Sequence, residues 1–212
     1  LAGCCRAVSG GDPGHPGAGG GDGRGVTRRR PTSAARLFWT SPYFGCKEIR
    51  AAQCDTSQPG TYEALLGELF RKLGFEVEFL GGAGKPDVLL TGRLGSQTYS
   101  AVIEAKTCRE SSVVDIGRVN YGSMRDHREE HEADYALLVA PAFSGGKVVE
   151  HAVRDKVGMM TTEALISVLR RHDQFPFSLT ELRRLFETPG LSDGVAAELG
   201  RDGARLVCEP ED

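Results

Sequence analysis

Hydrophobic and polar positions alternate with a helical period in the second quarter of the chain. Apolar residues between Thr61 and Gly74 recur about every 100° around one face, which predicts an amphipathic helix: Tyr62, Leu65, Leu66, Leu69, Phe70 and Leu73. Pro59-Gly60 before this stretch and Gly74 after it are typical of a helix start and a helix stop.

Further along the chain the period changes to that of strands and then back to helices. Residues 75–80 alternate, and residues 87–91, 98–106, 135–140 and 157–160 form short apolar runs, so each segment predicts a strand. Helices are predicted over residues 113–131, 162–172 and 179–186, and Ser178 with Glu181 forms a capping box for the last one.

This order of elements predicts an α/β fold built on a small mixed sheet. The first three strands follow one another without a crossover, so they pair as antiparallel hairpins, while a strand that follows a helix can join in parallel. Runs such as Tyr135–Ala140 are apolar on both faces, which indicates that helices flank both sides of the sheet.

The hairpin between Asp87 and Lys106 brings charged residues together. Gly95-Ser96 is a suitable pair for a tight type II′ turn. Folding the hairpin there places Asp87 opposite Glu104, on the same side of the sheet and about 5 Å apart. Lys106 projects on that side as well, about 7 Å further along the strand.

Two facing carboxylates at the end of apolar strands repel each other, and a divalent cation removes the conflict. Oxygen ligands of this kind suit Mg²⁺. Lys106 can then hold the attacking water or a phosphate. Glu63 lies at the rim of the apolar face of its predicted helix and can complete the site, whereas Glu68 points to solvent.

These residues resemble the motif of the PD-(D/E)xK nuclease superfamily. Lys85-Pro86-Asp87 and Ile103-Glu104-Ala105-Lys106 carry the motif, and the loop Gly81-Gly82-Ala83-Gly84 precedes it. The segment is most similar to the cleavage domain of type IIS restriction endonucleases. The similarity covers about residues 57–187 and implies a restriction-endonuclease-like αβββαβ core.

The resemblance implies a DNA endonuclease of a restriction-modification system. Asp87 and Glu104 would bind Mg²⁺, or Mn²⁺ as a substitute, with help from the Ala105 carbonyl. Lys106 would orient the nucleophilic water, and Glu63 matches a helix carboxylate that often belongs to the site.

The chain departs from the family pattern on the second helix. Many relatives carry glutamine where this chain has Arg118. Arg118, Arg125 and Lys85 are therefore expected to contact DNA phosphates.

Composition divides the chain into three parts. Residues 1–55 are rich in glycine and arginine and are expected to be a disordered segment. Residues 56–190 are expected to form the nuclease domain, and residues 191–212 a tail. The net charge of −3 and the hydrophobic content of 40% are ordinary for a globular protein.

The chain begins with leucine, so it is expected to be a fragment or a processed product. No apolar run approaches the ~20 residues of a membrane span, and the cysteines form no zinc-binding rhythm, which indicates a cytoplasmic protein. Duplex DNA is the expected partner. Because no base-reading module is visible, an upstream specificity domain and a weak or DNA-dependent homodimer are expected.

Two other functions are compatible with parts of the sequence. His127, Glu130 and His131 spell H-x-x-E-H, the motif of inverted zinc proteases, although the segment is so polar that it reads as a solvated helix face. A non-catalytic DNA-binding or interaction module on the same scaffold is the other alternative.

Overall fold

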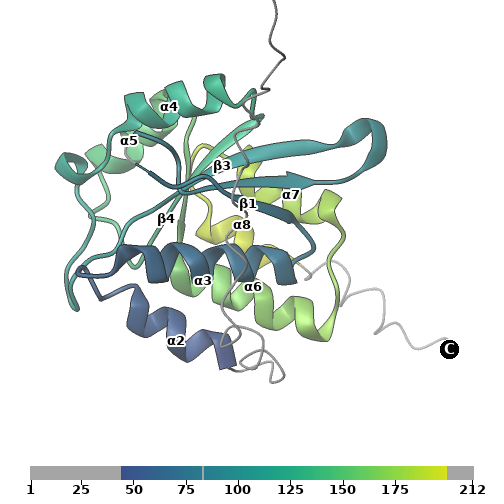
Figure 1. Ribbon diagram of the computed structural model, residues 1–212, viewed down its shortest axis with the longest axis horizontal. Helices are drawn as coiled ribbons and strands as arrows, with labels where there is room; N and C mark the ends of the chain where they lie inside the picture. Colours follow the sequence, from purple (N-terminus) through teal and green to yellow (C-terminus); the bar gives the residue numbers. More distant parts are fainter. Residues whose placement is uncertain (1–43, 83, 200–212) are drawn as a thin grey trace, which may run out of the picture.

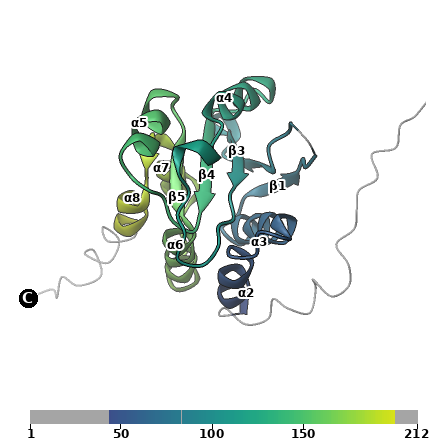
Figure 2. The ribbon, with the colours of Figure 1, turned by 90° about the vertical axis from the view of Figure 1, so that its left-hand side faces the viewer.

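The computed structural model describes residues 44–82 and 84–199, which form three layers with a sheet in the middle (Figures 1 and 2). The sheet has six strands in the order β1-β2-β3-β4-β5-β6. Their bounds are β1 Glu76–Phe79, β2 Val88–Gly92, β3 Tyr99–Ala105, β4 Tyr135–Ala140, β5 Gly158–Thr161 and β6 Gly190–Leu191. The β1–β2 and β2–β3 pairs are antiparallel and the remaining pairs are parallel, so the predicted mixed sheet is confirmed.

Helices cover both faces of the sheet, as its doubly apolar strands predict (Figure 2). One layer contains α2 Phe44–Ala52, α3 Pro59–Lys72, α6 Thr162–Gln174, α7 Leu179–Glu187 and α8 Asp193–Glu198. The other layer contains α4 Tyr121–Glu130 and α5 Lys147–Arg154. Successive strand residues point to opposite faces, so Ala101 and Ile103 of β3 pack in the first core and Val102 packs in the second.

The register predicted for the β2–β3 hairpin is confirmed, and so is the position of the turn at Gly95-Ser96. Val88 pairs with Ile103 and Gly92 with Tyr99, as a turn centred on Gly95-Ser96 requires. The strands separate beyond Gly92 and Tyr99. The Gln97 N–H donates to the Leu94 carbonyl at 3.1 Å across this turn, where Gly95 has a φ of 61°. A second such bond follows, from the Thr98 N–H to the Gly95 carbonyl at 3.2 Å, so the turn is part of a short 3₁₀ helix, η1 Gly95–Gln97. The loop of residues 93–98 is centred on Gly95-Ser96, so the same number of residues leaves the pairing on each side and the register is unchanged.

Gly92 shows why the strands pair closely at this end of the hairpin. A Cβ atom at this position would lie 2.7 Å from the ring of Tyr99, so a side chain would collide with the tyrosine. Tyr99 is itself buried and its hydroxyl donates a hydrogen bond to the Leu179 carbonyl at 2.7 Å, which ties the hairpin to the start of α7.

The helix predicted over residues 113–131 begins later than the sequence pattern indicates. A 3₁₀ helix, η2 Ile116–Arg118, comes first, and α4 starts only at Tyr121 with Asn120 as its N-cap. Val114 is in a strand-like bridge to Phe143, and its N–H donates to the Ala142 carbonyl at 2.9 Å. This tertiary pairing holds the chain extended where helical periodicity alone would continue the helix.

The structured domain extends beyond residues 56–190 at both ends. Helix α2 lies inside the segment that the sequence predicts to be disordered, and its residues Cys46, Ile49 and Ala52 are buried in the core. Helix α8 lies inside the predicted tail and buries Ala196. Residues 1–43 and 200–212 of these two predicted segments fall outside the described residues. Helix α5 is an element that the sequence pattern did not predict.

None of the described helices is long and apolar enough to span a membrane.

The burial of α2 predicts that this helix contributes to stability. Replacing Ile49, which has no exposed surface, by alanine is expected to lower the free energy of unfolding by about 2–5 kcal/mol, because a cavity forms in the core. The matched control Lys47→Ala removes an exposed side chain of the same helix and should change stability by less than about 0.5 kcal/mol. Chemical denaturation measures both, and equal stability of the two variants would mean that α2 is not docked.

Candidate active site

The paired ends of β2 and β3 hold three of the residues singled out in the sequence. Asp87 directly precedes β2, Glu104 is near the end of β3, and Lys106 directly follows β3. The Asp87 N–H donates to the Ile103 carbonyl at 3.2 Å, and the Asp87 Oδ2 accepts a hydrogen bond from the Ala105 N–H at 2.7 Å. These two bonds hold the Asp87 carboxylate against the end of β3, beside Glu104.

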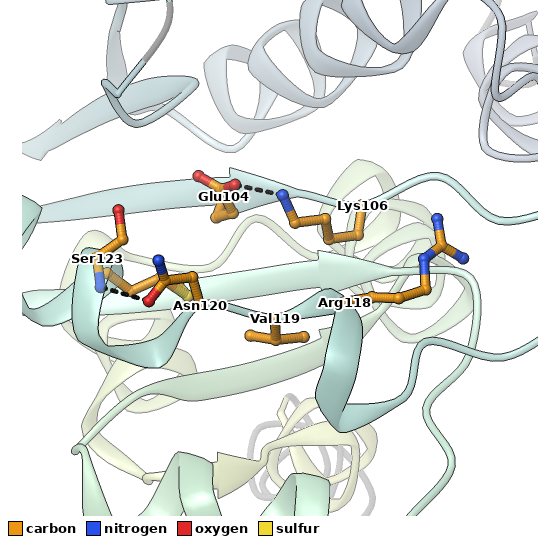
Figure 3. A pocket seen from close by; sticks show the side chains of 7 residues that line it. Glu104, Lys106, Arg118, Val119, Asn120 and Ser123 are labelled. Carbon is orange, nitrogen blue, oxygen red and sulfur yellow. Dashed lines mark hydrogen bonds and ion pairs between the residues drawn. The ribbon is translucent and has the colours of Figure 1, made fainter.

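Glu104 and Lys106 form an ion pair in this site (Figure 3). The Lys106 Nζ lies 2.5 Å from the Glu104 Oε1, and the two side chains are 30% and 19% exposed. The Lys106 N–H also donates to the Val139 carbonyl at 2.9 Å, so the backbone of β4 holds the residue in place. The amine is therefore fixed at the carboxylate while both groups remain reachable from solvent.

Glu63 reaches the same region from the first turns of α3. Burial raises the pKa of Glu63, and the negative charge of Glu104 raises it further, while Lys106 lowers it. The charges of Glu104 and Lys106 thus act on Glu63, which is half-buried on α3. Glu68, on the same helix, instead forms an ion pair with Arg71, in agreement with its predicted orientation away from the site.

Asp87 is the most strongly perturbed carboxyl group of the site. Burial, followed by the charge of Glu104 and a smaller effect of Glu63, raises the pKa of Asp87 to about 7. The Ala105 N–H and Lys106 act in the opposite direction. Near neutral pH the carboxyl groups of the site therefore repel one another, and part of Asp87 keeps its proton. Such a shifted pKa is typical of carboxylate clusters that bind cations.

The donor atoms of the site fit a small, hard divalent cation. Asp87 and Glu104 supply carboxylate oxygens, and the backbone carbonyl of Ala105 is the additional oxygen that the sequence suggested. Within residues 44–82 and 84–199, no three His, Cys, Asp or Glu side chains cluster tightly enough to enclose an ion by themselves. Mg²⁺ usually keeps several of its waters and is held by one or two carboxylates, so this sparse set suits it.

A small pocket opens beside the Glu104–Lys106 pair (Figure 3). Its volume is about 90 Å³, and it lies between the end of β3 and the segment that leads into α4. The lining residues are Glu104, Lys106, Arg118, Val119, Asn120, Ser123 and Met124. Asn120 and Ser123 were not among the residues singled out in the sequence, although Asn120 three residues before Ser123 is a recognisable helix-capping pattern, and the Asn120 Oδ1 accepts from the Ser123 N–H at 3.0 Å.

The three candidate DNA contacts lie in different settings. Arg118 lines the pocket, and its Nη2 donates to the Thr107 carbonyl at 2.8 Å. Lys85 is exposed on the loop before Asp87. Arg125 is exposed on α4, pairs with Asp126 at 2.9 Å, and is not one of the residues that line the pocket.

The zinc motif on α4 is arranged differently from the expected solvated helix face. His127 is only 7% exposed, and its Nε2 lies 3.0 Å from the Gly84 carbonyl oxygen. A carbonyl accepts but does not donate, so this nitrogen carries a hydrogen and is not free to bind a metal. Glu130 is exposed on the same helix. The geometry therefore does not favour a zinc protease.

The element order and the paired strand ends define a class of protein. A helix, an antiparallel three-stranded meander, a helix and a parallel strand form the core, and the acidic site lies where the second and third strands meet. This is the α/β core of restriction-endonuclease-like proteins.

Comparison with known proteins agrees with this class. The model of a family described as restriction endonuclease (Mrr_cat) matches residues 54–169, which is more than half of the chain. The chain therefore belongs to this restriction endonuclease family. No curated protein matches the sequence of the chain.

Two solved structures are similar in fold. The structure of restriction endonuclease FokI has a TM-score of 0.58 and 19% sequence identity over 71% of this chain and 31% of that chain. The structure of restriction endonuclease FokI bound to DNA has a TM-score of 0.58 and 20% identity over 78% of this chain and 34% of that chain. The chain thus spans about a third of the length of these structures, and the likeness at this identity concerns the fold alone.

The raised pKa of Asp87 predicts a pH dependence of stability in the metal-free protein. The ordinary pKa is 3.8 and the folded value is about 7, so between these values the folded state holds a proton that the unfolded state has lost. The stability that this proton provides is therefore fully present below about pH 4, declines as the pH rises, and is lost once the pH passes about 7. Melting temperatures in EDTA should fall more steeply between about pH 4.5 and pH 7 for the unmodified protein than for Asp87→Asn, which cannot ionise, and the two curves should run parallel above about pH 8. Curves that run parallel over the lower range as well would contradict the raised pKa.

Proposed function

We propose that this domain is a Mg²⁺-dependent endonuclease that hydrolyses phosphodiester bonds in double-stranded DNA. The single observation that carries the proposal is the convergence of Asp87, Glu104 and Lys106 at the paired ends of β2 and β3, in a chain of the restriction endonuclease family. Three free cysteines among the described residues, Cys46, Cys54 and Cys108, suit the reducing cytoplasm in which such an enzyme would act.

In the proposed mechanism, Asp87, Glu104 and the Ala105 carbonyl hold the cation, and Mn²⁺ can replace Mg²⁺. The bound ion would supply positive charge at the scissile phosphate and acidify a water molecule. Asp87 is oriented by the Ala105 N–H at 2.7 Å, so its second oxygen is available as a ligand. This orientation fixes the ligand before substrate binds and limits the reorganisation that the reaction requires.

Lys106 is proposed to orient the attacking water and to stabilise the charge that develops on the phosphate. In the absence of substrate its amine is held 2.5 Å from Glu104, which keeps it beside the metal ligands. Glu63, whose pKa is raised by burial and by Glu104, is proposed to accept a proton or to bind a water of the site.

Contacts with the DNA backbone are proposed for Arg118, Lys85 and Arg125. Arg118 has the strongest structural support, because it lines the pocket beside Lys106 and its guanidinium uses one donor on the Thr107 carbonyl. The remaining donors can reach a phosphate oxygen. Arg125 is tied to Asp126, so its contribution is expected to be the weakest of the three.

Substitution of the site residues tests the proposed chemistry. Asp87→Ala and Glu104→Ala remove metal ligands and should lower plasmid cleavage at least 100-fold, while Lys106→Ala should retain metal binding and lose turnover. The unmodified protein should cleave with Mg²⁺ or Mn²⁺, stop in EDTA, and bind without efficient cutting in Ca²⁺, whose bonds are longer. Supercoiled plasmid converted to nicked and linear forms provides the measurement.

A matched pair on α3 controls for general effects of lost charge. Glu63→Gln should reduce cleavage, whereas Glu68→Gln on the same helix should leave it unchanged, because Glu68 pairs with Arg71 and not with the site. Robust Mg²⁺-dependent cleavage by Glu104→Ala would disprove the site assignment. DNA binding by the unmodified protein with no cleavage in any divalent metal would favour the alternative, a non-catalytic DNA-binding module.

Assembly and specificity are proposed to lie partly outside this domain. One set of carboxylates serves one scissile phosphate, so cutting both strands requires a second copy, and we propose a weak or DNA-dependent homodimer. Sequence recognition is assigned to a further, upstream domain, since reading base edges requires an element in a groove and this chain covers only about a third of the compared FokI structures.

The order of the reaction in protein concentration tests this assembly. Nicking should rise in proportion to concentration, whereas linearisation should rise more steeply, because it requires two copies on one DNA. The products should show little sequence preference. A monomer that makes double-strand breaks at one defined sequence would show that the domain carries its own recognition element.

A further inference from the structure

His127 is a buried residue that the proposed chemistry does not use. It lies on α4, is 7% exposed, and its Nε2 lies 3.0 Å from the carbonyl oxygen of Gly84 and 3.2 Å from the Ser123 Oγ. Gly84 belongs to the loop that connects β1 to Asp87. His127 therefore connects α4 with the loop that delivers a proposed metal ligand.

The hydrogen-bond partners determine which nitrogen of the ring carries the hydrogen. The Gly84 carbonyl can only accept, so Nε2 carries a hydrogen and donates it. The Nδ1 atom is buried and has no hydrogen-bond partner among the described residues. A buried polar atom without a partner costs free energy, so histidine is not the residue that stability alone would select at this position.

The glycines of the loop that His127 contacts place little restraint on its backbone. Gly81, Gly82 and Gly84 all have positive φ angles of 49°, 109° and 74°, and a Cβ at any of them would meet no atom within 4 Å. Glycines with open surroundings leave the backbone many accessible conformations. The Lys85 N–H donates to the Gly82 carbonyl at 3.2 Å, which shapes the turn without attaching it to another element.

The helix at the other end of this hydrogen bond forms one side of the site. Asn120, Ser123 and Met124 line the pocket that faces Glu104 and Lys106, and Ser123 also contacts His127. The bond between His127 and Gly84 thus joins the two sides of the site, one ending at Asp87 and the other lining the pocket.

We propose that His127 is a positioning residue that fixes the glycine loop to α4 and thereby sets the position of Asp87 for metal binding. The inference rests on the proposed function of Asp87 as a metal ligand. His127 itself touches neither metal nor substrate in this scheme. Its effect reaches the site through Lys85 and Pro86, the two residues between Gly84 and Asp87.

Two substitutions separate positioning from general stability. In His127→Gln the side-chain amide nitrogen can replace Nε2 as the donor to Gly84. In His127→Leu the hydrogen-bond donor to Gly84 is lost, and so is the buried Nδ1 atom that has no partner among the described residues. Because Gly84 is exposed, its carbonyl can bind water in place of His127, so the melting temperature should change little. Glu129→Gln, an exposed change on the same helix, serves as the control.

Hydrogen exchange of the metal-free, full chain gives a readout that does not require activity. In His127→Leu, the amides of Lys85 and Asp87 should exchange about fivefold faster or more, the factor expected from loss of one hydrogen bond, while amides of β4 keep their protection. His127→Gln should restore slow exchange.

Binding of Mn²⁺ or Mg²⁺ measured by calorimetry gives the second readout. His127→Leu should weaken metal binding about fivefold or more, and cleavage should recover to near the unmodified rate at saturating metal, whereas Glu129→Gln should match the unmodified protein. Unchanged loop exchange and metal affinity in His127→Leu would overturn the proposal, as would loss of protection throughout the fold. If the unmodified protein fails to cleave DNA, the proposed function fails, but the exchange experiment still decides whether His127 anchors the loop.

Discussion

The pairing of β2 with β3 determines the position of every strand residue in the site, because side chains alternate between the two faces of a sheet. Val88 opposite Ile103 places the preceding Asp87 beside Glu104, and the Ala105 N–H then binds the Asp87 carboxylate. A slip by one residue would turn Glu104 and Lys106 to the opposite face. The alternation along β3 opposes that slip, because it would turn Glu104 into the core in which Ala101 and Ile103 are buried.

The same geometry creates an electrostatic conflict that the fold tolerates. Desolvation and the neighbouring Glu104 raise the pKa of Asp87 to about 7, and Glu63 adds a third carboxyl group from α3. Lys106 offsets only part of this charge. Without a cation, this repulsion between carboxyl groups lowers the stability of the fold, which is typical of groups that serve a function. The three carboxyl groups lie together at the ends of the strands, where solvent can enter.

The helical layers matter because they hold the two sides of this site together. Helix α3 presents Glu63, while α4 lines the pocket and carries His127, whose bond to Gly84 reaches the loop before Asp87. Helix α2 supports α3 from outside through Cys46, Ile49 and Ala52 in the same core. The site therefore depends on segments that are distant along the chain and become neighbours only when the layers pack.

The sequence by itself determined the mixed α/β fold, the strand register and the grouping of Asp87, Glu104 and Lys106, because strand alternation and hairpin pairing are local rules that follow from the order of residues. It did not determine the start of α4, which tertiary pairing of Val114 with Phe143 delays to Tyr121. Nor did it reveal the inward orientation of His127 in a polar segment or the docking of α2 and α8 at the ends of the domain. Those features depend on contacts between residues far apart in the chain, where packing outweighs the local pattern of polarity.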